Sequence, residues 1–269
     1  MAIHAEFYKH KDFDGSVETF DLNNNYRYWW IKFGSNLGNE ISSFRANAFN
    51  GFNGNVYAMT KNNFLGKYLS LNMNENWTAW WSWVGSNLND DIESALLINR
   101  NKDELVIEVA DLIADDFKSG IDEALQGKPV KRRGDPKIYS LFWPGHDPSR
   151  KFVSIEQNLK VEVDWWPDYD AQVRYDVYLY LNSRGNVRGC VAWTYCWVEG
   201  GIFSGRIYND LQPQLVSGAS TLTTQIQDKL SLLSFATFRD LYLLPGSQPS
   251  NSFGDIGDTK DNSTLVLVN

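Results

Sequence analysis

The sequence predicts a multi-domain protein, with an all-β domain over residues 1–101 followed by an α+β domain over residues 102–269. The first observation behind this division is a repeat, because the stretch Gly34–Ser43 returns in altered form as Gly85–Ser94, 51 residues later. Repeats of this length usually mark a copied supersecondary unit. The second observation is a change of pattern after Arg100, where amphipathic helical periodicity appears for the first time.

Short strands joined by tight turns account for the first domain. Residues 5–8 and 17–20 have strand character and are separated by a turn that contains Gly15. Asn residues are frequent throughout this domain, and Asn favours tight turns because it tolerates left-handed backbone. The tryptophans are expected to pack in the core, with a carbohydrate-facing or membrane-facing platform as the alternative. They are Trp29, Trp30, Trp77, Trp80, Trp81 and Trp83.

The spacing Tyr8, Phe13, Gly15 resembles the Greek-key signature of the beta-gamma-crystallins, and Tyr57 with Phe64-Leu65-Gly66 is a looser copy with two extra residues in its loop. The calcium signature of that family has two Asn/Asp, two variable residues, then Ser/Thr and Ser. The stretches 38–43 and 89–94 are similar to it. The resemblance covers about residues 3–99 and implies a double Greek-key sandwich.

The resemblance also implies bound Ca²⁺, with each ion shared between the two keys. One loop would offer a carbonyl at its third signature position, the other a side-chain oxygen at its fifth, and the residue after each tyrosine a further carbonyl. Such a set suits a hard cation that takes oxygen ligands. Two residues depart from the signature: Gly38 lacks a side-chain oxygen, and Glu93 replaces Ser/Thr. The implied metal-site residues are Lys9, Gly38, Asn39, Glu40, Ser42, Ala58, Asn89, Asp90, Asp91 and Glu93.

In the second domain, apolar residues at three-four spacing predict an amphipathic helix over residues 104–126, ended by Gly127 and Pro129. A loop with a basic patch at 131–133 is expected over residues 128–150. Alternating patterns then predict an antiparallel meander. Its strands are 153–163, 172–181, 187–198 and 202–208.

A second amphipathic helix is predicted over residues 212–233, a mobile segment over 245–260 and a short strand over 264–268. The apolar segment 235–244 fits helix or strand equally. A long helix against a curved meander is an arrangement used by lipid-cradling modules, which is an argument from fold analogy alone. Cys190 and Cys196 fall about 20 Å apart along one strand, too far to pair with each other.

Several function classes are disfavoured. A formal net charge of −8 argues against nucleic acid as a partner. No metalloprotease, nucleophile-elbow or phosphate-loop motif is present, so we expect no enzyme. The best catalytic candidates, Asp164, Asp168 and Asp170, are better explained as solvated acids of a turn. No signal peptide or membrane helix is found, so synthesis in the cytoplasm is expected, with export by a leaderless route left open.

The sequence therefore predicts a non-enzymatic, calcium-binding protein of beta-gamma-crystallin type. Its α+β domain would bind a membrane, an apolar ligand or a protein partner, and a toxin or effector is one specific form of this hypothesis. The alternatives are a calcium-stabilised structural or stress protein and a glycan-binding protein.

Overall fold

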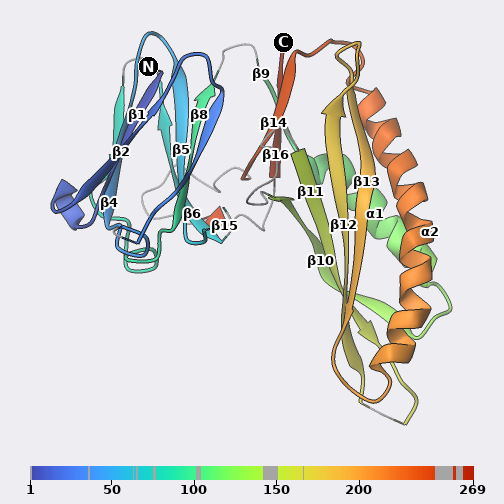
Figure 1. Cartoon of the computed structure of the whole chain (residues 1–269). Coiled ribbons are helices and arrows are strands. Elements are labelled where there is room, and N and C mark those ends of the chain that lie inside the picture. The colour runs from blue at the N-terminus through green and yellow to red at the C-terminus, as the bar shows by residue number, and fades with distance from the viewer. Residues whose placement is uncertain are drawn as a thin grey trace. The chain divides into compact units, whose positions relative to one another are not determined.

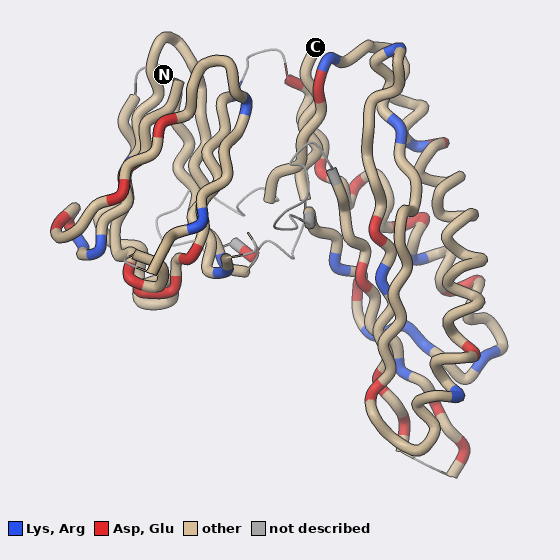
Figure 2. The backbone as a smooth tube through the Cα atoms, in the orientation of Figure 1, with Lys and Arg blue, Asp and Glu red and all other residues tan. Residues whose placement is uncertain are grey.

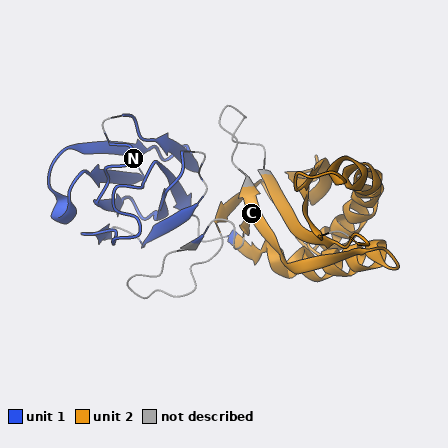
Figure 3. Cartoon of the chain, turned by 90° about the horizontal axis from the view of Figure 1, so that it is seen from below, with its two compact units in different colours: residues 1–104, 142–144, 247–259 blue, residues 105–141, 145–246, 260–269 orange. Residues whose placement is uncertain are grey.

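The computed structural model describes residues 2–269 except 36, 63, 65, 75–76, 101–103, 142–150, 166, 246–256 and 259–262. The chain forms two compact units, of which unit 1 takes in Met1–Glu104 and unit 2 begins at Leu105 (Figure 3). In the described part of the chain the structure is mostly antiparallel sheet, with two α-helices. The predicted fold class is therefore confirmed as β-rich with several sheets.

Unit 1 contains two four-strand sequences that follow one another along the chain (Figure 1). The first comprises β1 (Ile3–Tyr8), β2 (Val17–Leu22), β3 (Tyr28–Lys32) and β4 (Ser43–Ala48), with a short 3-10 turn at Lys11–Phe13. The second comprises β5 (Asn53–Met59), β6 (Lys67–Met73), β7 (Thr78–Trp81) and β8 (Ser94–Arg100).

The two halves of unit 1 exchange their third strands. One sheet has the order β2-β1-β4-β7, and the other has the order β15-β6-β5-β8-β3, where β15 is Gly257–Asp258. Each sheet therefore contains three strands of one half and the third strand of the other. Between the sheets lies a core in which Phe7 stacks on Phe44 and meets Phe33 edge-on. Neither half can complete its sheet alone, so the fold ties the two copies together.

Unit 2 is built from a four-stranded meander, a three-stranded sheet and two helices. The meander consists of β10 (Val130–Leu141), β11 (Lys151–Val161), β12 (Tyr169–Leu181) and β13 (Val187–Val198), in that order. The small sheet has the order β14 (Asp240–Pro245), β16 (Ser263–Val268), β9 (Glu104–Glu108). The helices are α1 (Val109–Leu125) and α2 (Ser204–Ser231).

Both helices cover the same face of the meander, and α2 runs along β13 (Figure 1). Alternate residues of β12, including Val173, Tyr175 and Val177, point into this buried layer, as the period of a strand requires. The helices meet them with their apolar stripes, for example Phe117 of α1 and Leu222 of α2. Three strands of the predicted meander, β11, β12 and β13, and the two amphipathic helices are confirmed.

Several predicted element types or boundaries in unit 2 were wrong. Residues 104–108 form strand β9 beside the fully buried β16, so the helix starts only at Val109. The predicted loop contains strand β10, which pairs with β11 and buries Val130 and Ile138 in the core of unit 2, while each cation of its basic patch has an acidic partner; residues 142–150 lie outside the described part. The predicted strand 202–208 belongs mostly to α2, since Ile207 and Leu211 extend the apolar stripe of the helix.

The remaining expectations concern the end of the chain. Segment 235–244 contributes a strand, β14, from Asp240 onward. Most of the segment predicted to be mobile, 245–260, lies outside the described residues, but Gly257–Asp258 pairs with β6. Both cysteines are free and lie in β13.

Candidate functional site

Two loops of unit 1 lie side by side: the first loop, residues 34–42, precedes β4, and the second loop, residues 85–93, precedes β8. The Asn39 amide donates to the Ile92 carbonyl at 3.1 Å, which joins the loops directly. The residues flanking the loops are joined as well, since the amides of Phe33 and Val84 donate to the carbonyls of Glu93 and Ser42, at 3.0 and 2.9 Å. The repeat detected in the sequence is therefore one continuous surface in the fold.

The loops also share their backbone conformation. The amides of Gly38 and Asn89 donate to the carbonyls of Gly34 and Gly85, at 2.7 and 2.9 Å. The next residues, Asn39 and Asp90, have φ angles of 63° and 61°, a left-handed conformation that Asn and Asp tolerate. A Cβ added to Gly38 would lie 3.0 Å from the Gly34 carbonyl oxygen, so this turn is tight. The Asn/Asp residues of the signature thus have a conformational role in addition to any ligand role.

The first half of unit 1 brings two predicted ligand oxygens together. The Ser42 hydroxyl donates to the Lys9 carbonyl at 2.8 Å, and the Ser42 amide donates to the Tyr8 carbonyl at 3.0 Å. The Lys9 ammonium forms an ion pair with the Glu40 carboxylate at 2.7 Å. A hydroxyl and a carbonyl at this separation are both hard oxygens of the kind that Ca²⁺ binds, so these residues fit the ion.

The second half has a carboxylate in place of the serine. The Glu93 amide donates to the Met59 carbonyl at 3.0 Å, and the Glu93 carboxylate accepts a hydrogen bond from the Asn62 amide at 2.7 Å. The carboxylate therefore turns back toward the loop that follows β5, on the side where Ser42 meets Lys9 in the first half. A carboxylate in this position can provide one or two oxygens to a hard cation.

The structure gives Thr60, and not Ala58, the place in the second half that Lys9 has in the first. The hydroxyls of Ser43 and Ser94 donate to the carbonyls of His10 and Lys61, both at 2.6 Å, so these positions are equivalent. Counting back, Met59 matches Tyr8 and Thr60 matches Lys9, whereas Ala58 lies within β5 and pairs with Leu69 and Ala95. The carbonyl equivalent to that of Lys9 belongs to Thr60. The sequence contained this signal, because Phe13 and Phe64, like Gly15 and Gly66, are also 51 residues apart.

The loops carry a net negative charge. The two loops contain four carboxylates, those of Glu40, Asp90, Asp91 and Glu93. Acidic positions gather at one end of unit 1 (Figure 2, red). Within the described residues, no group of three or more His, Cys, Asp or Glu side chains is arranged to hold a metal. A site built from carbonyls with one hydroxyl, or from carbonyls with one carboxylate, does not need such a group.

The tryptophans of unit 1 were expected in the core, but only Trp81 packs against it, partly buried, and Trp30 is also partly buried. Trp29, Trp77, Trp80 and Trp83 are each more than half exposed. Trp29 and Trp80 occupy equivalent places in the exchanged edge strands β3 and β7, where alternate side chains face outward. The exposure of these four rings fits the alternative interpretation, a carbohydrate-facing or membrane-facing platform.

Unit 2 contains an apolar cavity of about 560 Å³ between α1, α2 and the meander. Its floor is formed by buried side chains of the sheet, Leu159, Val173 and Tyr175, and its walls by helix residues such as Phe117 and Leu215. Burial raises the pKa of Tyr175 to about 12, so its phenol is neutral at pH 7, and it donates to the Leu215 carbonyl at 3.3 Å. The volume and the apolar lining are those of a small-molecule site.

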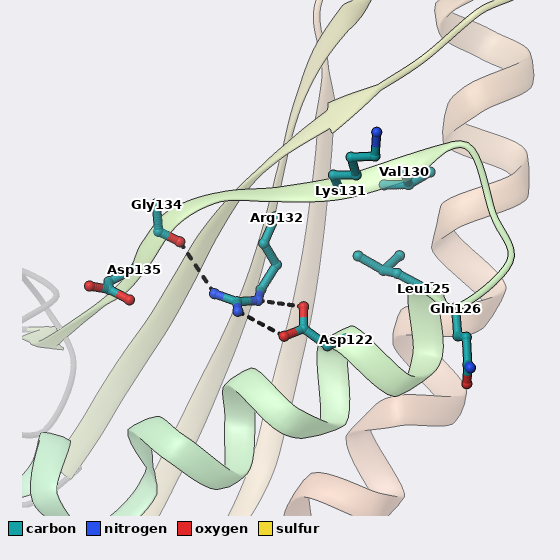
Figure 4. A pocket seen from close by; sticks show the side chains of 8 residues that line it. All are labelled: Asp122, Leu125, Gln126, Val130, Lys131, Arg132, Gly134 and Asp135. Atoms are coloured by element: carbon teal, nitrogen blue, oxygen red, sulfur yellow. Dashed lines mark hydrogen bonds and ion pairs between the residues drawn. The ribbon is translucent and has the colours of Figure 1, made fainter.

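A second hollow lies at the end of α1 and is polar (Figure 4). Arg132 of β10 forms two hydrogen bonds to the Asp122 carboxylate, at 2.6 and 2.7 Å, and its guanidinium also reaches the Gly134 carbonyl. Arg132 holds the pKa of Asp122 below its usual value through these hydrogen bonds. Since the two charges satisfy each other, this hollow is explained as the junction of helix and strand.

Of the three acids considered as catalytic candidates, Asp164 is exposed, and Asp168 and Asp170 form ion pairs at the surface. Asp168 pairs with Lys160 at 2.7 Å and Asp170 with Arg133 at 2.8 Å. Sequence reasoning missed a buried carboxylate, Asp176, whose pKa is raised by burial and which bonds to the Ser154 hydroxyl and to Arg174. Arg174 precedes Asp176 by two residues on β12, whereas Ser154 lies on β11 and meets Asp176 only through the register of the two strands.

No protein-family model, curated protein or solved structure matches this chain. Among the described residues, neither helix is both long and apolar enough to cross a membrane. The functional argument therefore rests on the geometry of the two loops and of the cavity.

Proposed function

We propose that this chain is a calcium-binding protein whose unit 1 is a double Greek key of beta-gamma-crystallin type, and whose unit 2 binds an apolar ligand. The observation that carries the first part is the equivalence of the two loops. The two loops have the same backbone turn, 51 residues apart in the sequence, and are joined by hydrogen bonds. Each belongs to one of the two halves that exchange their third strands.

Two sites for Ca²⁺ are proposed. The first would use the Lys9 carbonyl and the Ser42 hydroxyl with the Asp91 carbonyl of the second loop. The second would use the Thr60 carbonyl and the Glu93 carboxylate with the Glu40 carbonyl of the first loop. The ion supplies a positive charge that offsets the acidic side chains of both loops, and it joins the two halves through ligands from each.

A bound ion that recognises only the folded state stabilises it by mass action, by about 2.7 kcal/mol at a concentration 100 times the Kd. For a domain of about 100 residues, each kcal/mol raises the Tm by roughly 4–8 °C. We therefore expect calcium to raise the Tm of unit 1 by an amount on the order of 10 °C in calorimetry. An unchanged melt in calcium and in chelator would overturn the calcium proposal, and magnesium serves as the ionic-strength control.

The cavity of unit 2 is the observation that favours an apolar ligand over a membrane or a protein partner. A purely structural or stress protein needs no such cavity, because empty apolar space lowers stability. Glycan binding is the second candidate, and it rests on the exposed Trp29, Trp77, Trp80 and Trp83. A titration with oligosaccharides that leaves the tryptophan fluorescence unchanged would remove it.

A further inference from the structure

The cavity of unit 2 is a slot between two helices rather than an irregular void. Two polar contacts join the elements around it: the Asp116 carboxylate of α1 pairs with Lys229 of α2 at 3.2 Å, and the Lys128 ammonium, after the end of α1, bonds to the Gln214 side chain of α2. Along α2 the lining of the slot runs from Leu211 to Gln225, about 21 Å at 1.5 Å per residue. One acyl chain of a bilayer leaflet spans about 15 Å, half of the hydrocarbon core, so the slot is long enough for a single chain.

Glycines keep the slot open. Gly120 of α1 lines it, and a Cβ at Gly120 would meet only the Gln225 side chain, at 3.7 Å. Gly218 of α2 also lines it, and a Cβ there would lie 2.9 Å from the Tyr175 hydroxyl oxygen. Glycine costs stability inside a helix, by about 1 kcal/mol relative to Ala. Two glycines at one slot are therefore consistent with a requirement for space between the helices.

The polar groups of the slot lie at its mouth and favour an anion. The floor is buried and apolar, whereas Lys128, Gln214, Ser217 and Thr221 line the exposed rim. An ammonium, an amide and two hydroxyls can all donate hydrogen bonds to a carboxylate. Glu123, the one acid in the lining, is exposed and free to turn toward water.

We propose that this slot binds a single-chain amphiphile with an anionic head, of the fatty-acid type, with its chain between α1 and α2 and its carboxylate beside Lys128. This inference rests on the proposed apolar-ligand function of unit 2 and specifies the chemical class of the ligand. It requires no contribution from the calcium loops.

The test is displacement of a fluorescent fatty acid from the full chain by palmitic acid, by shorter saturated acids and by hexadecanol. We expect palmitic acid to displace the probe, and each methylene removed to weaken binding about fourfold. Lys128→Met should weaken palmitic acid about two- to fivefold, as for an exposed ion pair, and leave hexadecanol unchanged. Lys131→Met, which alters a lysine outside the slot, should change neither ligand.

Gly120→Leu should fill the slot and weaken every ligand at least tenfold, whereas Gly205→Leu, at a helix position with open space, should have no effect. Unchanged binding by the folded Gly120→Leu protein would overturn the location. If Lys128→Met affects the acid and the alcohol equally, the anionic class fails while the apolar-ligand function stands. If no apolar compound displaces or binds, both fail.

Discussion

Ser42 and Glu93 occupy equivalent places in the two halves of unit 1, because the amide of each donates to the last carbonyl of the first strand in its own half, at 3.0 Å in both cases. Their side chains differ, since the Ser42 hydroxyl bonds to the Lys9 carbonyl and the Glu93 carboxylate to the Asn62 amide. Two sites with one backbone frame thus have different ligand chemistry, and two unequal calcium affinities are expected.

The first prediction concerns the charge of Glu93. Glu93→Gln keeps the size of the side chain and its ability to accept from the Asn62 amide, but removes a formal charge from the proposed second site. We expect calcium affinity at that site to fall at least tenfold, about 1.4 kcal/mol, while the first site is unchanged. Isothermal titration measures both sites. Ser86→Ala, in the same loop but outside the proposed ligand set, is the matched control, and equal effects of the two substitutions would contradict the assignment.

The second prediction concerns the space at Gly218. Gly218→Ala places a methyl group 2.9 Å from the Tyr175 hydroxyl oxygen, so overpacking should destabilise unit 2 by about 1–3 kcal/mol. Gly205→Ala has nothing within 4 Å of the new methyl group and should stabilise α2 by about 0.5–1 kcal/mol. Urea denaturation of both variants checks the contrast, and a Gly218→Ala protein as stable as the wild type would show that Tyr175 relaxes freely.

The third prediction concerns pH. The hydrogen bond from Arg45 holds the pKa of Glu6 below its usual value, and the Tyr8 hydroxyl at 3.0 Å acts in the same direction. Because the folded-state pKa is lowered, the stabilisation is present above the unfolded pKa and is lost as pH falls through the folded pKa. Unit 1 should therefore lose stability below about pH 4.5, and Glu6→Gln should flatten this dependence in chemical denaturation.

Arg45→Met supplies the cross-check, because it removes the cation that lowers the pKa of Glu6. Like Glu6→Gln, it should weaken the loss of unfolding free energy at acid pH. The double variant should differ little from either single variant, since the two side chains act as one pair. If the free energy of unfolding still falls steeply at acid pH in all three variants, the pH dependence comes from other carboxylates.

Elements with clean periodicity could be predicted from the sequence. Strand β13 has the predicted bounds, 187–198, and the stripe of α1 that includes Ile113 and Phe117 is buried as expected. The bounds of α2 were harder, since the predicted start at residue 212 falls inside the helix, which begins at Ser204. Pro213 lies exposed within it, although proline supplies no N–H for a helical hydrogen bond.

Of the two candidate sites, the loops of unit 1 could be predicted from the sequence and the cavity of unit 2 could not. The loops are local in sequence, so the equivalence of Ser42 and Glu93 was visible, although the equivalence of Met59 to Tyr8 was missed because Tyr57 lies two residues away. The cavity could not be predicted, since it depends on how α1 and α2 pair on the sheet and brings Gly120 close to Gln225, far apart in sequence. Packing between distant elements leaves no local signature.

The central claim, that the paired loops of unit 1 bind calcium, is tested most directly by calorimetric titration of calcium into the chelator-stripped full chain. The account predicts two bound ions per chain, a weakened first site in Ser42→Ala, a weakened second site in Glu93→Gln, and unaltered binding in Ser86→Ala. Absence of calcium binding by the folded wild-type chain, or binding that neither Ser42→Ala nor Glu93→Gln alters, would contradict it.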